Sequence, residues 1–427
     1  MRVKKILLCL VLEMVCFCVF SNDIKANEFK QIQPYYESEL LVYPYGSYDT
    51  SVVFDVDDFE TEEDYLKYAR DNSIVVSEDN GLHRSARSSF SDVTPTVDCI
   101  ANLDSDHNHA IQAFYRKNAN EIYISQKYDE IEFNGIPYND PSKYVLISRC
   151  KREKVNGRYE FHILDSMLLE GVGHGQTLES YTYNNKTYFL VSCGGAVFKD
   201  NNDNVTGVWS QEIGRVQYKA NTVVYNSNID RLVDLGYFIT DPTDSVKRVD
   251  AAIYGTSNLL IWTRTTKKKN HFAVYSFSKI NKCLSNDVYD HTVSFLTNSA
   301  LRNAELCSFD NPSNMPLSVQ GLDISEKKNG MYSIYISSGN EKYTDIDGNQ
   351  NRPLEIRHFK TDNSFVKGVH VLNTGLWTGY GEGSYYTATA EMEGFKYVSS
   401  KVWFVLRNTG KPSEQILCSM KTSELGK

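Results

Sequence analysis

A short pattern of apolar and polar residues recurs five times along the chain. Each copy consists of an apolar residue, a polar residue, a small residue and a second apolar residue, although one copy lacks the first apolar residue. The copies are Ile111-Gln112-Ala113-Phe114, Gly175-Gln176-Thr177-Leu178, Val249-Asp250-Ala251-Ala252, Val319-Gln320-Gly321-Leu322 and Met392-Glu393-Gly394-Phe395. Their polar positions are separated by steps of 64, 74, 70 and 73 residues. A unit that repeats at a nearly constant spacing indicates a repeat architecture.

A second, more apolar run follows each copy after about ten residues. These runs are rich in β-branched and aromatic residues, which is typical of strands. They comprise residues 122–124, 188–191, 259–262, 334–336 and 402–406. Turn signals such as Asn156-Gly157 and Asn184-Asn185 separate the expected strands. Each unit is long enough for a four-stranded sheet, so the pattern predicts an all-β, five-bladed β-propeller. Ser276 to Leu284 is expected to form a short helix between blades.

The repeated polar residues are expected to converge, because the first strand of each propeller blade lines the central axis. This places Gln112, Gln176, Asp250, Gln320 and Glu393 in one ring. One interpretation is a structural belt of hydrogen bonds that fixes the register of the blades. The other is a binding funnel of carboxylates and amides, which suits sugars or other polyols.

Two neighbours of Gln176 join these ligand-binding candidates, namely His174 and Glu179. His174 lies between two glycines, and three roles stay open for it: a general base, a metal ligand or a hydrogen-bonding strand residue.

The N-terminal part of the chain differs from the repeats. Residues 1–26 resemble a secretory signal peptide, with a basic start and an apolar stretch from Ile6 to Phe20, and an uncleaved membrane anchor is the alternative. Residues 27–96 form an acidic, partly helical segment and linker, and residues 97–427 form the propeller. The segment is either a cleavable pro-region that masks the active surface or a tether that donates an edge strand.

Charge and cysteine content exclude some classes of function. The net charge is −9, residues 27–98 hold 5 basic and 16 acidic residues, and residues 99–427 balance at 36 of each. No cationic patch therefore indicates nucleic acid as a partner. Six cysteines lie beyond the signal peptide at wide spacings, which fit isolated buried thiols as well as disulfides.

Two acidic loops are weak calcium candidates, because they place oxygen ligands at every second residue. They contain Asp104, Asp106 and Asn108 in one loop and Asp345, Asp347 and Asn349 in the other. Neither loop completes an EF-hand, and no other cofactor is expected.

Several motifs resemble the large, class III bacteriocins of the helveticin J type. They are Gly173-His174-Gly175-Gln176-Thr177, Gln211-Glu212-Ile213-Gly214-Arg215-Val216, Lys247-Arg248-Val249-Asp250-Ala251-Ala252, His271-Phe272-Ala273-Val274-Tyr275 and Val319-Gln320-Gly321-Leu322-Asp323-Ile324. The resemblance extends from about Ala110 to the C-terminus. It implies an antibacterial protein, secreted by a Gram-positive bacterium, that kills related bacteria and recognises a surface glycan or wall polymer, with the target membrane as a further partner. It supplies no catalytic residue.

A glycoside hydrolase is the main alternative, because five-bladed propellers also carry enzymes that use two carboxylates. Asp250 and Glu393, with Glu179 nearby, would be the acids available. A surface lectin that does not kill is the third possibility. No motif of serine, cysteine or zinc hydrolases is present.

Overall fold

The computed structural model describes most of the chain from Phe90 onward. The described residues are 34–35, 40–44, 51–55, 90–101, 110–128, 132–133, 136–137, 144–200, 205–312, 315–316, 318–339, 343–344, 350–351, 354–371, 390–408 and 415–426. The chain divides into two compact units, Met1–Glu37 with Val197–Gly207, and Ser38–Ala196 with Val208–Lys427. The signal peptide and the helix predicted within residues 27–96 lie outside the described residues.

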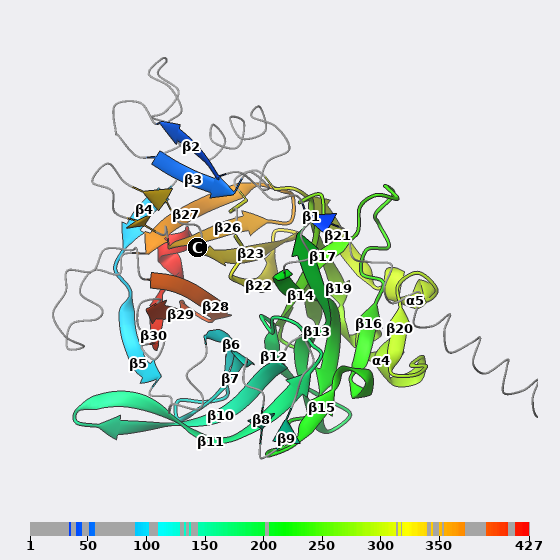
Figure 1. Cartoon of the computed structure of the whole chain (residues 1–427), viewed down its shortest axis with the longest axis horizontal. Coiled ribbons are helices and arrows are strands. Elements are labelled where there is room, and N and C mark those ends of the chain that lie inside the picture. Colours follow the sequence, from blue (N-terminus) through cyan, green and yellow to red (C-terminus); the bar gives the residue numbers. More distant parts are fainter. Residues whose placement is uncertain are drawn as a thin grey trace, which may run out of the picture. The chain divides into compact units, whose positions relative to one another are not determined.

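The described chain is mostly β-sheet with few helices, which confirms the all-β class (Figure 1). Five successive groups of strands each form an antiparallel meander, in which every strand pairs with the next. The first group is β6 (Ile111–Arg116), β7 (Glu121–Tyr128), β10 (Tyr144–Val155) and β11 (Arg158–Glu170). The second is β12 (Leu178–Tyr183), β13 (Lys186–Asp200), β14 (Val205–Val216) and β16 (Asp230–Val233).

The remaining groups repeat this order. The third is β17 (Val246–Tyr254), β18 (Asn258–Thr265), β19 (Asn270–Ser276) and β21 (Glu305–Asp310). The fourth is β22 (Gly321–Lys328), β23 (Met331–Ser338), β26 (Glu355–Lys360) and β27 (Phe365–Val371). The fifth is β28 (Ala390–Val398), β29 (Lys401–Asn408) and β30 (Gln415–Lys421). The five apolar runs predicted from the sequence lie in the second strands of these groups, β7, β13, β18, β23 and β29.

Two N-terminal strands complete the last two groups. The strand β4 (Phe90–Val93) pairs in parallel with β27. The strand β5 (Thr96–Ala101) pairs with β30 in antiparallel fashion and, over two residues, with β11 in parallel. The strand β4 is therefore an edge strand donated by the N-terminal segment, which is one of the two uses predicted for that segment, whereas β5 begins at the segment's last residue and lies between β30 and β11. Cleavage of the segment stays a prediction.

The other elements are short. They are β1 (Pro34–Tyr35), β2 (Leu40–Pro44), β3 (Ser51–Asp55), β8 (Glu132–Phe133), β9 (Ile136–Pro137), β15 (Val223–Tyr225), β20 (Thr292–Ser294), β24 (Tyr343–Thr344), β25 (Gln350–Asn351), α4 (Phe277–Asn286), α5 (Ser299–Arg302) and the 3-10 helices η4 (Asn226–Asn228) and η6 (Thr422–Leu425). Helix α4 is the one predicted near residues 276–284, but it connects β19 to β21 within one group rather than joining two groups. No helix of the described part combines the length and apolar character needed to cross a membrane.

The predicted turn residues adopt the backbone conformation that tight hairpins need. Asn156 and Gly157 have φ angles of 49° and 85°, and Asn184 and Asn185 have 49° and 60°. Asparagine and glycine tolerate this left-handed region, which matches the twist of the two strands that they connect. These turns thus fix the register of the β10–β11 and β12–β13 hairpins.

The apolar cores lie between consecutive groups of strands. One core joins the first and second groups, the next joins the second and third, and the series continues through the fourth and fifth. A further core joins the fifth group back to the first, with Trp403 and Leu417 packed in the same cluster as Phe114 and Ile122. The first strands follow the same cycle, since β6 contacts β12 and β28, β17 contacts β12 and β22, and β22 contacts β28.

The six described cysteines are free thiols, and none of these six forms a disulfide. Cys99, Cys150, Cys193 and Cys418 are buried on strands. Burial raises the pKa of the Cys99 thiol to about 12, so it stays protonated near neutral pH. Of the two alternatives that the cysteine spacings left open, the described residues thus show free thiols, five of them buried and Cys307 half-buried.

Candidate functional site

The five repeated polar residues are all buried. Gln112, Asp250 and Glu393 lie on the first strands β6, β17 and β28, and the exposed fraction of each is at most 4%. Gln176 and Gln320 lie just before β12 and β22, with exposed fractions of 7% and 4%. The structure thus buries all five on or just before the first strands of their groups.

Residues 173–177, just before β12, do not form a strand. Gly173 and Gly175 have φ angles of 87° and 74°, which break the strand ladder. A Cβ atom on Gly173 would lie 2.7 Å from the backbone nitrogen of Ser210, and one on Gly175 would lie 2.5 Å from the side chain of Val145. The strand therefore begins only at Leu178.

Hydrogen bonds connect the buried polar residues to one another. The Gln176 side-chain amide donates to the Gln320 Oε1 atom at 3.0 Å. The Gln112 side chain lowers the pKa of Glu393 and so favours its ionised form. The Thr177 hydroxyl lies 3.5 Å from Asp250 Oδ1 and accepts a hydrogen bond from the Ala251 amide at 2.9 Å. These contacts join first strands of different groups, which is what the belt interpretation requires.

Arg248 neutralises the charge of Asp250 and was missed by the sequence analysis. Its Nε and Nη2 atoms lie 2.9 and 2.8 Å from Asp250 Oδ2. Its guanidinium group also lies over the rings of Trp209 and Trp262, at 4.8 and 5.1 Å from their centroids. Burial raises the pKa of Asp250, and the Arg248 charge opposes that rise. The sequence feature that could have identified Arg248 is its position two residues before Asp250, because residues i and i+2 of a strand lie on the same face.

Glu393 lacks such a close cation. Burial and the nearby Glu391 carboxylate raise its pKa well above the usual range, while Arg407 and Arg248 oppose the rise. Its Oε2 atom has no hydrogen-bond partner among the described residues. Burial and the Glu391 carboxylate both favour the protonated form of Glu393, which can donate a hydrogen bond.

His174 lies in the loop before β12 and is not a strand residue. Its ring stacks on the ring of Trp209 at 4.6 Å, and its backbone amide donates to the Ser210 hydroxyl at 3.2 Å. No group of three or more His, Cys, Asp or Glu side chains in the described part of the chain is arranged to hold a metal ion. The calcium candidates Asp104, Asp106, Asn108, Asp345, Asp347 and Asn349 lie outside the described residues.

Glu179 belongs to a pocket rather than to the buried ring. The pocket has a volume of about 190 Å³, and all five first strands contribute to its lining. One residue from each strand lies three positions after the repeated polar residue. These five are Tyr115, Glu179, Ile253, Asp323 and Lys396. We call this set the second layer. The sequence analysis found only Glu179, because the residue type at this position differs in every repeat.

Two carboxylates and one ammonium group meet in this pocket. The Lys396 ammonium pairs with the Glu179 carboxylate. Asp323 accepts a hydrogen bond from the Ile324 amide at 2.7 Å and another from the Tyr397 amide. Burial raises the pKa of Asp323 to about 7, with Lys396 lowering it and Glu179 raising it. Burial also raises the pKa of Glu179 against the effect of Lys396.

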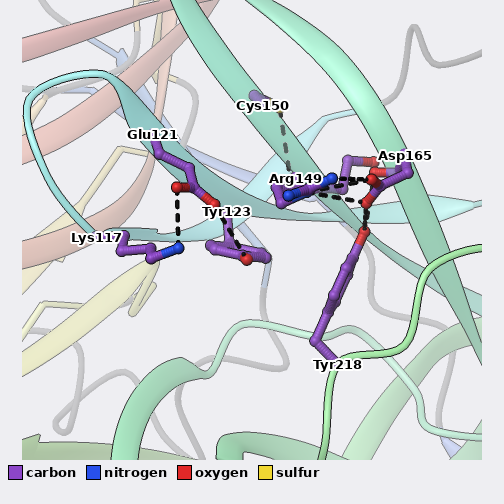
Figure 2. Close-up of polar contacts among 8 residues, drawn as sticks. Lys117, Glu121, Tyr123, Arg149, Cys150, Asp165 and Tyr218 are labelled. Carbon is purple, nitrogen blue, oxygen red and sulfur yellow. Dashed lines mark hydrogen bonds and ion pairs between the residues drawn. The ribbon is translucent and has the colours of Figure 1, made fainter. Parts of the chain in front are cut away.

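An aromatic cluster supports one wall of the pocket. The ring of Tyr115 packs edge-on against Phe189 at 6.0 Å and lies 6.5 Å from Tyr123. Tyr123 in turn packs against Tyr218 at 5.1 Å. Figure 2 shows the Tyr218 hydroxyl directed at Asp165, which also pairs with Arg149 across the β10–β11 hairpin. This network fixes the rings behind Tyr115.

The pocket offers two kinds of chemistry. The carboxylates accept hydrogen bonds from hydroxyl groups, and the ammonium group donates hydrogen bonds to them, so the pocket suits a polyol. A protonated acid beside an ionised carboxylate also matches the requirement of a glycoside hydrolase. In that case Glu179 and Asp323 would be the acids, rather than Asp250, which Arg248 neutralises.

Comparisons with solved structures give distant similarities. A protein of unknown function from Dyadobacter fermentans has 9% identity and a TM-score of 0.34, over 76% of this chain and 97% of that one. A glycosyl hydrolase from Bacteroides ovatus has 9% identity and a TM-score of 0.35, over 78% and 91%. A β-1,2-mannobiose phosphorylase from Listeria innocua has 9% identity and a TM-score of 0.34, over 76% and 91%. No curated protein matches the sequence.

A family comparison is more informative. The model of the family described as bacteriocin helveticin-J matches residues 85–374, which is more than half of the chain. The match includes four of the five repeats and the segment that contains His174 and Gln176. The chain therefore belongs to the helveticin-J bacteriocin family.

Proposed function

We propose that this protein is a secreted bacteriocin that binds a glycan on the surface of related Gram-positive bacteria and kills them. Membership of the helveticin-J bacteriocin family is the observation that carries the antibacterial part. The glycan part is supported by the pocket of carboxylate, ammonium and aromatic side chains. Secretion is supported by the N-terminal sequence, where a basic start precedes an apolar stretch.

The scaffold for this function is a five-bladed β-propeller formed by the five groups of strands. The cycle of contacts among the first strands and the closing core between the fifth and first groups support this arrangement. In this interpretation β5 is the outer strand of the last blade and closes the ring. The buried belt of polar residues keeps the blades in register, and the second layer forms the binding surface at one end of the axis.

The acidic N-terminal segment has a separate proposed role. Residues 27–89 mask the binding surface or tether the propeller, and residues 90–101 remain with the propeller because they supply β4 and β5. Cleavage near Arg87 would therefore leave both strands in place. Removal up to residue 95 would instead delete β4.

An overlay assay on a panel of related Gram-positive strains tests the proposal. The secreted chain and a chain that begins at residue 88 are spotted on each strain, and the same samples are incubated with purified cell walls. Zones of killing without released reducing sugar support the bacteriocin. Greater potency of the shorter chain supports masking.

Released reducing sugar would instead favour the glycoside hydrolase. The pocket carboxylates Glu179 and Asp323 favour this second candidate, since such an enzyme needs one protonated and one ionised acid, and burial raises the pKa of both. Loss of sugar release in Asp323→Asn would then identify the acid. Binding to cell walls without killing and without released reducing sugar would indicate a surface lectin.

A further inference from the structure

We propose that the second-layer pocket holds one neutral sugar unit at the end of a glycan chain. This inference names the ligand of the glycan-binding function proposed above and rests on it.

The size of the pocket limits the ligand to a single ring. Pockets for drug-sized ligands measure about 300–1,000 Å³, whereas this one measures about 190 Å³. A volume of this order accommodates one sugar ring and excludes a longer segment. Further units of a chain would have to extend out of the mouth.

The pocket is closed at its inner end. Of the described residues, its lining includes the second layer but none of the five buried polar residues of the belt. These lie three positions back along the chain, or about 10 Å away where the backbone is extended. Belt residues of different strands are joined by hydrogen bonds such as that between Gln176 and Gln320. A glycan cannot pass through such a layer, so the pocket accepts a chain end.

The charges around the pocket favour a neutral ligand. Lys396 compensates Glu179, and Arg116, which also lines the pocket, lies 3.9 Å from Asp98. Asp323 already accepts two backbone hydrogen bonds. An anionic ligand would meet two carboxylates and a cationic one would meet Lys396 and Arg116, so neither finds an uncompensated partner to offset its desolvation. Neutral hydroxyl groups can donate to the carboxylates and accept from Lys396.

Aromatic walls provide the apolar contacts. Tyr115 is held by the cluster of Tyr123 and Phe189. Tyr397 is stacked on Tyr335 with ring centroids 5.1 Å apart and an interplanar angle of 4°. Two fixed tyrosine rings on different strands give the C–H faces of a sugar ring a surface to pack against, while the polar groups select its hydroxyls.

Retention on purified cell walls of a susceptible strain tests the inference. The full chain is compared with Val398→Trp, which fills the mouth of the pocket from a position that is 51% exposed. The matched control is Leu164→Trp, which is also 51% exposed but does not line the pocket. Thermal unfolding checks that both variants fold. We expect retention to fall at least about tenfold in Val398→Trp only.

Competition with free sugars identifies the ligand class. Glucose, galactose and N-acetylglucosamine are the neutral probes, and glucuronic acid and glucosamine are the charged ones. We expect at least one neutral sugar at millimolar concentration to displace the chain and the charged sugars to fail. Equal or stronger displacement by a charged sugar would overturn the inference.

Failure of this inference is distinct from failure of the proposed function. If Val398→Trp is retained normally and no neutral sugar competes, the pocket is not the binding site. Killing and wall binding by the unchanged chain would still support the proposed bacteriocin function. If the unchanged chain neither binds walls nor kills, the proposed function itself is wrong and the pocket loses its support.

Discussion

At the scale of single residues, the ion pair between Lys396 and Glu179 in the pocket is almost fully buried. Only 12% of the lysine side chain and 7% of the glutamate side chain are exposed. Removing water from two charges is unfavourable, and their attraction offsets this loss only while both are present.

The variant Lys396→Met should reduce the free energy of unfolding by about 3–5 kcal/mol at neutral pH, because it leaves Glu179 and Asp323 without their cation. The loss should shrink as the pH falls, since a protonated carboxyl needs no partner and burial already raises the pKa of both acids. Urea unfolding at several pH values measures this.

Two further variants test whether that loss comes from the unpaired charge. Adding Glu179→Gln to Lys396→Met should restore much of the stability, because it removes one of the stranded charges. The exposed pair of Lys117 and Glu121 (Figure 2) serves as the comparison, since Lys117→Met should cost less than about 1 kcal/mol. Equal losses for the two lysine variants would contradict the argument.

His370 is the titrating residue that binds β4 to its neighbours. Burial opposes its charge, but Glu355 and Asp92 outweigh burial and raise the pKa of the imidazole. Because its folded pKa lies above the unfolded value, this contribution to stability is complete below the unfolded pKa and is lost as the pH rises through the folded one. The side chain is 47% exposed, so water screens the effect.

Asp92→Asn should lower the pKa of His370, because it removes one of the two carboxylates that favour the imidazolium ion. An NMR titration of the histidine ring protons would measure the change. The same titration of the unchanged chain is the reference. An unchanged His370 titration would show that β4 does not lie beside it in solution.

At the scale of elements, Phe90 anchors β4 on β27. Its ring stacks on His370 at 5.0 Å and lies against Gly368, where a Cβ atom would come within 2.2 Å of the ring. The Phe90 ring can therefore occupy this position only because residue 368 has no side chain. A parallel edge strand of only four residues depends on such an anchor.

Gly368→Ala should therefore loosen β4, because the added methyl group displaces the Phe90 ring. We expect a loss of about 1–3 kcal/mol in the free energy of unfolding and faster trypsin cleavage near Arg87. Lys367→Ala, on the same strand, is the control and should change neither quantity. A fully stable Gly368→Ala variant with unchanged cleavage would show that β4 is not anchored in this way.

The sequence predicted elements better than it predicted the pocket. Hairpin turns such as Asn156-Gly157 require specific backbone conformations, and the repeated tetrads share one burial pattern, so both leave clear local signals. The break before β12 was missed because the close approaches at Gly173 and Gly175 involve residues distant in sequence, Ser210 and Val145. The second layer was missed because Asp323 and Lys396 become partners of Glu179 only through the arrangement of the strands.

At the scale of the whole molecule, the proposed closure of the five groups into a propeller depends on β5. This strand carries the buried residues Cys99 and Ala101 into the core between the fifth and first groups, and it pairs with strands from both. Without it, the edge of β30 would be unpaired and that core would lose part of its packing. An open sheet edge of this kind promotes association between molecules.

Three chains that begin at residues 88, 95 and 102 separate the roles of the two N-terminal strands. The first keeps β4 and β5, the second loses β4 only, and the third loses both. Relative to the first chain, we expect a small fall in the unfolding temperature for the second, because β4 lies at the outer edge of its sheet. For the third we expect a loss of at least about 3 kcal/mol, since buried side chains leave the core, together with aggregation at the exposed edge. Calorimetry measures the unfolding, and light scattering measures the aggregation.

The chains from residues 102 and 88 could instead unfold at the same temperature. In that case β5 would not close the molecule, and the five-bladed arrangement would lose its main support.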